Sequence, residues 1–263
     1  MTWKEVFRNS FKSLGQEIGL DARMEEGQLV CKPLDPQDPR YAVDFILPSM
    51  KMVSACHSND FDFFQPALKA GLINEAQILH ACERYHLGKT KSGQPIFWMI
   101  NDMLEPQDAH IGDSWISYLL KAREPLLKYW RVQHCLFGLH LLYTMPSDLP
   151  ISIVEHEASA VILSELFPES IWMAYTTITH VLPDLLDPLE GRTVTIFPST
   201  DNTLSNYVFF LEYSDLIYRT HLPIDLQIDP TLEDHATQDQ KERGIDILDF
   251  ILEGKSQTTC STM

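Results

Sequence analysis

The chain has 263 residues, of which 44% are hydrophobic and 22% are charged, a balance typical of globular proteins that bury a core. Its formal net charge of −17 comes from 20 Lys and Arg against 37 Asp and Glu, so the charge does not favour a nucleic-acid partner, although it leaves one possible. No apolar run approaches the roughly 20 residues that span a bilayer and the N-terminus lacks a signal-peptide pattern, so we expect a cytoplasmic protein with no membrane partner.

The first half of the chain predicts helices followed by one strand. Apolar residues recur at helical spacing in three segments, and Gly71 is placed to cap the second of them. A proline-rich stretch, KPLDPQDPR, predicts a linker. The expected elements are a helix over 3–18, a linker over 32–40, helices over 60–70 and 74–85, a strand over 96–100 and a helix over 114–129.

From about residue 148 the pattern changes to short apolar strands alternating with helices. Strands that are apolar throughout are typical of parallel sheets covered on both faces, and the alternation predicts βαβ units. The fold class we expect is therefore α/β. The expected elements are strands over 151–154, 171–175 and 193–197, helices over 158–166, 203–219 and 240–252, and a disordered end over 253–263.

Acidic residues follow two of these strands. Glu155 and Glu157 come after the first strand, and Asp201 comes after the third. Ligands of such sheets bind beyond the carboxyl ends of the strands, so the three carboxylates are candidates for one site. The alternative is structural, because acids near a helix start also stabilise the helix dipole or cap the helix.

Other residues give weaker signals. Lys121, Arg123, Lys128 and Arg131 form the best basic cluster and are the candidate nucleic-acid contacts, although solvated helix residues would look the same. The five cysteines are odd in number and contain no CxxC, which argues against a disulfide framework and a cysteine zinc site. The sequence has no P-loop, GxGxxG, GxSxG or HExxH motif.

Five segments, in order, resemble a bacterial family that joins a primase-type N-terminal subdomain to a toprim domain and occurs on mobile or conjugative elements. Together they cover about residues 44–252. The segments are ERYHLGKTKSGQPIFW (83–98), QHCLFGLHLL (133–142), ISIVEHEASAVIL (151–163), GRTVTIFPS (191–199) and the stretch from 234 to 252.

The resemblance implies an Mg²⁺ site and also its decay. A toprim domain has a Glu after its first strand, here Glu155, and Asp-x-Asp after its third, here Ser199-Thr200-Asp201, so the first Asp is missing. Ala158 replaces a lysine of the family, and Ala174 to Thr177 replace its glycine-rich ATGG. Hard Mg²⁺ prefers oxygen ligands, so we expect weak binding by Glu155, Glu157 and Asp201, with Glu155 as the candidate catalytic residue.

The resemblance also implies the domain organisation and the function classes. We expect an N-terminal helical segment and linker (1–40), a primase-type subdomain (41–147), a toprim-like domain (148–252) and a disordered tail (253–263). The leading expectation is a primase-like accessory protein with little or no catalysis that binds nucleic acid or a protein partner. The alternatives are an Mg²⁺-dependent nucleotidyl-transfer or nuclease enzyme, and an acidic protein-interaction module.

Overall fold

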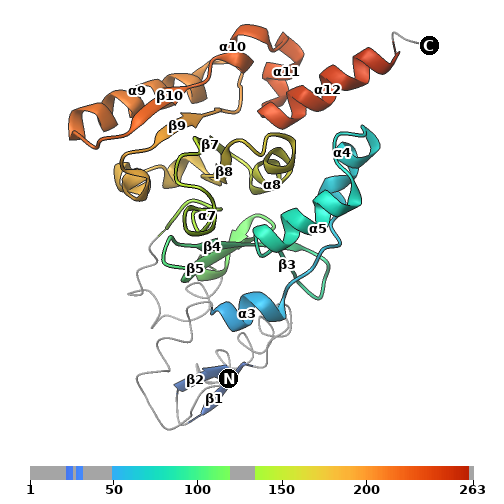
Figure 1. Ribbon diagram of the computed structural model, residues 1–263, viewed down its shortest axis with the longest axis vertical. Coiled ribbons are helices and arrows are strands. Elements are labelled where there is room, and N and C mark those ends of the chain that lie inside the picture. Colours follow the sequence, from blue (N-terminus) through green and yellow to red (C-terminus); the bar gives the residue numbers. More distant parts are fainter. Residues whose placement is uncertain (1–21, 26–27, 32–48, 119–133, 261–263) are drawn as a thin grey trace, which may run out of the picture.

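The chain has an α/β fold, as the sequence predicts, and its described residues form a four-stranded antiparallel sheet, a four-stranded parallel sheet and a two-stranded hairpin (Figure 1). The computed structural model describes residues 22–25, 28–31, 49–118 and 134–260. The helix predicted over 3–18 and the linker over 32–40 lie outside these residues. Within the part of the chain described, no helix is both long and apolar enough to span a bilayer.

The N-terminal part contains a short hairpin and a group of small helices. Strands β1 (Ala22–Glu25) and β2 (Gln28–Cys31) pair antiparallel. Two helical segments were predicted over 60–85, and both are present, the second beginning with a capping box made by Asn74 and Gln77. The helical elements are α3 (Met50–Ala55), η1 (Asp62–Phe64), α4 (Gln65–Lys69) and α5 (Glu75–Arg84).

The antiparallel sheet follows α5 and has the order β3-β4-β5-β6. Its central strand β4 (Pro95–Ile100) was predicted, and its partners were not. They are β3 (Gly88–Lys89), β5 (Pro106–Ile111) and β6 (Ser114–Trp115). The helix predicted from residue 114 begins only at Ile116, because Ser114 and Trp115 pair with β5 instead.

The parallel sheet contains four strands in the order β10-β9-β7-β8. Strands β7 (Ile151–Val154), β8 (Ile171–Ala174) and β9 (Thr193–Ile196) match the predicted strands, and every residue of β7 and β8 is buried. The fourth strand, β10 (Asp225–Ile228), was missed because its burial alternates, as expected at a sheet edge. Strand β7, the first in sequence, lies between β8 and β9.

Helices cover this sheet and return to it at the C-terminus (Figure 1). The predicted helix over 240–252 is two helices, because Gly244 has a φ of +63° and ends the first one. The second extends to Cys260, so the end expected to be disordered from 253 is helical that far. The helical elements are α7 (Leu141–Thr144), α8 (Glu157–Leu166), η3 (Ile178–His180), η4 (Pro183–Leu189), α9 (Ser205–Thr220), α10 (Thr231–His235), α11 (Gln238–Arg243) and α12 (Ile247–Cys260).

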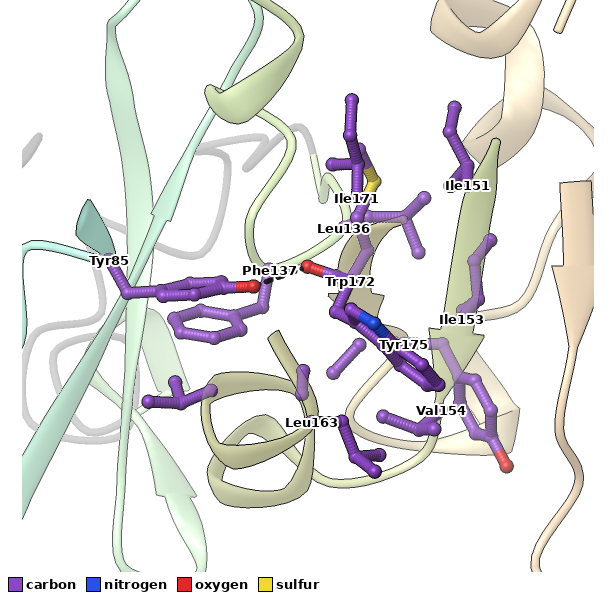
Figure 2. Packing of buried hydrophobic residues seen from close by; sticks show 14 of the residues in the cluster. Tyr85, Leu136, Phe137, Ile151, Ile153, Val154, Leu163, Ile171, Trp172 and Tyr175 are labelled. Carbon is purple, nitrogen blue, oxygen red and sulfur yellow. Dashed lines mark hydrogen bonds between the residues drawn. The ribbon is translucent and has the colours of Figure 1, made fainter. Parts of the chain in front are cut away.

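The N-terminal part closes the outer edge of β8. Phe137 forms an antiparallel bridge with Ala174 through hydrogen bonds of 2.9 and 3.0 Å between their backbones. The hydroxyl of Tyr85 donates a 2.8 Å hydrogen bond to the carbonyl of Trp172, and its ring stacks on Phe137 (Figure 2). The two sheets therefore share one hydrophobic core, which extends from Phe61 to Leu248.

Candidate functional site at the carboxyl edge of the parallel sheet

Glu155 and the segment Ser199–Asp201 leave the parallel sheet at the same edge. Strands β7 and β9 are parallel neighbours, with Ile153 opposite Ile196, so their carboxyl ends lie side by side. Glu155 follows β7 directly and is half-buried, and its carbonyl accepts a 2.9 Å hydrogen bond from the amide of Thr176 after β8. The exits of three neighbouring strands thus meet at this edge, where ligands of open α/β sheets bind.

The side chain of Asp201 caps the start of α9. Its carboxylate accepts hydrogen bonds from the backbone amides of Thr203, Ser205 and Asn206, at 2.7, 3.2 and 2.8 Å. Partial burial alone would raise the pKa of Asp201, but these hydrogen bonds and one from the Thr203 hydroxyl outweigh it and hold the pKa well below its ordinary range. The capping alternative considered from the sequence therefore describes the side chain of Asp201.

Ser199 lies at the position where the toprim resemblance implies an aspartate. The residue is 3% exposed, and its hydroxyl has no hydrogen-bond partner among the described residues. A buried hydroxyl without a partner is uncommon, because its desolvation is not compensated. Two hydrogen bonds hold the backbone around it. The Ser199 carbonyl accepts one of 3.2 Å from the Asn206 side chain, and the Thr200 amide donates one of 2.9 Å to the Ile245 carbonyl.

Thr176 keeps a backbone conformation that favours glycine. It lies in the segment where the resembling family has glycines, and its φ is +65°. A β-branched residue at positive φ is an outlier, and such strain concentrates at functional sites. Thr176 therefore adopts the backbone conformation that suits the glycines implied at this segment by the toprim resemblance.

Glu157 does not join the other two predicted carboxylates. Its side chain is buried at the first turn of α8, where it forms a 2.9 Å ion pair with Nδ1 of His110 on β5. Burial alone would lower the pKa of His110, but the hydrogen bond and charge of Glu157, with smaller effects of Asp113 and Asp108, raise it. Glu157 thus connects α8 to β5 of the antiparallel sheet, and no pattern in the sequence indicated His110 as its partner.

Asp246 is a buried carboxylate that the sequence analysis missed, and its charge, like that of Glu155, acts on Tyr175. Asp246 is 2% exposed, accepts a 2.5 Å hydrogen bond from the hydroxyl of Ser159 on α8 and caps α12 through the Asp249 amide. Burial, and then Glu155 and Asp246, raise the pKa of Tyr175 well above its usual value, so both carboxylates are close to this phenol. Figure 2 shows the Tyr175 hydroxyl pointing away from the core cluster.

The signal for Asp246 was present in the closing segment of the family resemblance, which here contains GIDILDFIL. Besides this resemblance, the sequence predicts one helix over 240–252. Its two aspartates instead form a reciprocal cap: Asp246 accepts from the Asp249 amide at 3.0 Å, and Asp249 accepts from the Asp246 amide at 3.4 Å. Burial and the charge of Asp246 raise the pKa of Asp249.

The donors at this edge fit Mg²⁺ only through a small number of direct ligands. No group of three or more His, Cys, Asp or Glu side chains within the described segments is arranged to hold a metal ion. Mg²⁺ keeps several waters and often binds through one or two carboxylates, so half-buried Glu155 could hold a hydrated ion, whereas Asp246 is 2% exposed and both of its oxygens already accept hydrogen bonds. Such an ion would offset the charge repulsion between these carboxylates and an incoming phosphate.

The four basic residues predicted to contact nucleic acid, Lys121, Arg123, Lys128 and Arg131, lie outside the described residues. Two described bases stand near the sheet edge, and both are paired with acids. Lys241 contacts Glu233 at 2.8 Å, and Arg243 contacts Glu253 at 2.7 Å.

Residues 62–200 match the family described as Domain of unknown function (DUF6371). The matched region is more than half of the 263-residue chain and includes β7, β8, β9, Glu155 and Ser199. It ends one residue before Asp201 and does not include Asp246. No curated protein matches the chain in sequence.

Proposed function

Since the chain belongs to the DUF6371 family, whose matched region contains the exits of β7 and β9, we propose that it is a toprim-like accessory protein of a mobile element. In this proposal Glu155 holds one hydrated divalent cation at the carboxyl edge of the parallel sheet, and the buried charge of Asp246 adds to the negative potential there. The cation lets the acidic edge accept a phosphate group of a nucleic acid, with little or no phosphoryl transfer.

The observation that carries the proposal is the placement of Glu155. It follows the first strand of a four-stranded parallel sheet, and the Ser-Thr-Asp segment follows the third strand, which is its direct neighbour. This is the arrangement that the toprim resemblance implies. Weak binding and weak catalysis follow from the substitutions: Ser199 contributes a neutral hydroxyl, and Asp201 is already hydrogen-bonded to α9.

Thermal unfolding in the presence of Mg²⁺ or Mn²⁺ tests the proposal. An ion at roughly ten times its Kd stabilises the folded state by about 1.4 kcal/mol, which for a chain of this size raises Tm by about 3 to 5 °C. We expect such a rise for the wild-type protein at millimolar ion. Glu155→Gln keeps the size of the side chain and removes its charge, so we expect this variant to lose the rise.

Glu190→Gln is the matched control. Glu190 is exposed and lies just before β9, at the opposite end of the strand from the site, so the same charge is removed away from the ion. We expect this variant to keep the full rise in Tm. The proposal is wrong if the wild-type protein shows no rise, or if Glu155→Gln and Glu190→Gln respond to the ion equally.

A further inference from the structure

Helix α9 is apolar on two opposite faces. Its inner face buries Phe210, Tyr213 and Ile217 in the core. Five large apolar side chains of α9 and its N-cap residue are exposed, one of them Leu216 (44% exposed), and we call the other four, which follow a heptad spacing, the α9 stripe. The stripe consists of Leu204 (45% exposed), Val208 (45%), Leu211 (44%) and Tyr218 (83%). Amphipathic surface helices normally carry polar residues on the outer face, so the stripe needs an explanation.

The spacing of the stripe is that of a helix seam. Steps of four, three and seven residues join Leu204, Val208, Leu211 and Tyr218, which is a heptad pattern with Asp215 at the remaining position. The three stripe residues inside the helix, from Val208 to Tyr218, lie in one row about 15 Å long at 1.5 Å per residue, and Leu204 precedes them at the N-cap with a φ of +60°. A straight row of this length on a convex helix fits a second helix lying along it.

The stripe is open to approach by a partner. Helix α9 lies with β10 at the end of the molecule opposite the antiparallel sheet (Figure 1). Contiguous exposed apolar side chains rimmed by polar ones are typical of interaction sites. Here the rim is acidic: Glu212 and Asp215 are exposed, and Arg219 is the single base in the sequence of α9.

We propose that the α9 stripe docks an amphipathic helix of a partner protein that has apolar residues at heptad spacing and Lys or Arg beside them. The apolar row selects a helix, and the acidic rim with the net charge of −17 selects a basic one. The proposal is independent of the cation site, because it uses the outer face of α9 and no residue of the sheet edge.

A second copy of this chain fits the stripe less well. In a symmetric contact between two α9 helices, Glu212 and Asp215 of each copy would face the same acids of the other copy, and like charges oppose such pairing. Stable dimers also bury about 800 Å² on each partner. The stripe offers only four side chains for such a contact, and three of them are less than half exposed. The stripe is therefore suited to one docked helix.

Fluorescence anisotropy of the full chain with a labelled synthetic peptide tests the proposal. The probe is a helical peptide with Leu at its a and d positions and Lys at e and g, and its counterpart has Glu in place of Lys. We expect the Lys peptide to bind and the Glu peptide to bind at least roughly tenfold more weakly. Val208→Ser with Leu211→Ser should weaken Lys-peptide binding by a similar factor, without changing the net charge.

Tyr143→Ser is the matched control, because Tyr143 is an exposed aromatic residue on α7, 71% exposed, away from α9. This variant should bind the Lys peptide as the wild type does, and circular dichroism should show all variants folded. Glu212→Gln with Asp215→Asn should weaken binding and remove its salt dependence. The proposal is overturned if neither peptide binds, if the stripe variants bind like the control, or if sedimentation shows a dimer that the stripe variants abolish.

Discussion

At the scale of single residues, His110 and Glu157 form the connection with the clearest consequence for pH. Their ion pair joins β5 of the antiparallel sheet to the first turn of α8. Because Glu157 and the nearby acids raise the pKa of His110 in the folded protein, the folded state binds this proton more tightly than the unfolded chain does. The pair therefore stabilises the fold fully below the unfolded pKa of about 6.5 and loses this effect as the pH rises through the folded pKa.

Glu157→Gln tests this connection. We expect the variant to have a lower His110 pKa than the wild type, measured by NMR titration of the imidazole. The loss of unfolding free energy caused by the substitution should be largest below about pH 6.5 and should shrink at higher pH. Glu169→Gln removes an exposed carboxylate just after α8 and should leave the His110 pKa unchanged, so equal behaviour of the two variants would contradict the assignment.

At the scale of elements, β8 depends on a glycine of the N-terminal part. Gly138 has a φ of +85°, and a Cβ at this position would lie 3.0 Å from the Trp172 carbonyl and 3.2 Å from the Tyr85 ring. The bridge from Phe137 and the Tyr85 hydrogen bond occupy the same strand edge. An added methyl group would therefore push against the two contacts that seal the sheet.

Gly138→Ala should therefore destabilise the protein more than a glycine substitution without neighbours. Gly191→Ala is the control, since Gly191 has a φ of +77° and no atom within 4 Å of its would-be Cβ. The conformational cost alone is about 1 to 2 kcal/mol in both variants, and the contacts at Gly138 should add roughly 1 to 3 kcal/mol. Urea unfolding measures the difference in unfolding free energy. Equal destabilisation of the two variants would show that the edge of β8 accommodates the added methyl group without losing stability.

Elements defined by local pattern were predictable from the sequence, and elements defined by distant partners were not. Strands β7, β8 and β9 are apolar throughout, so their type follows from burial on both faces. Strands β5 and β10 carry polar residues that alternate or interrupt the pattern, and they form because a neighbouring strand pairs with them. The α/β class was confirmed, while the toprim kinship stays a prediction.

The candidate site divides in the same way. Glu155 could be placed from the strand that precedes it. The partner of Glu157 could not, because His110 lies 47 positions earlier in a strand that was not predicted. Asp246 was within a segment whose resemblance had been noted, but its position beside α8 depends on the αL turn at Gly244, which redirects α12. The spacing of apolar residues in the sequence does not predict that turn.

At the scale of the whole molecule, the two predicted halves, divided after residue 147, share one core. The ring of Phe97 in the antiparallel sheet packs edge to face on Phe137, with 5.6 Å between the ring centroids. The backbone of Phe137 in turn pairs with β8. No polar layer separates the sheets at this point, since the cluster is continuous from Phe61 to Leu248. Separating the halves would expose this cluster to water. The unfolding of either half should therefore strongly lower the stability of the other.

We therefore expect a single cooperative unfolding transition. Trp98 lies fully buried in β4, and Trp172 lies buried in β8, so each reports on a different sheet. In protein labelled with fluorotryptophan, the two native 19F resonances, assigned by Trp→Phe variants, should disappear at the same urea concentration. Two separate midpoints would show that the halves are independent domains.

The order of the strands also decides when the site can exist during synthesis on the ribosome. The central strand β7 emerges first, β8 joins one side of it, and β9 and then β10 extend the other side. Asp246 reaches Ser159 only after nearly all of the chain has been made. A nascent chain can thus assemble its sheet while the acidic edge still lacks Asp246. Any product that stops before Gly244 never acquires this carboxylate.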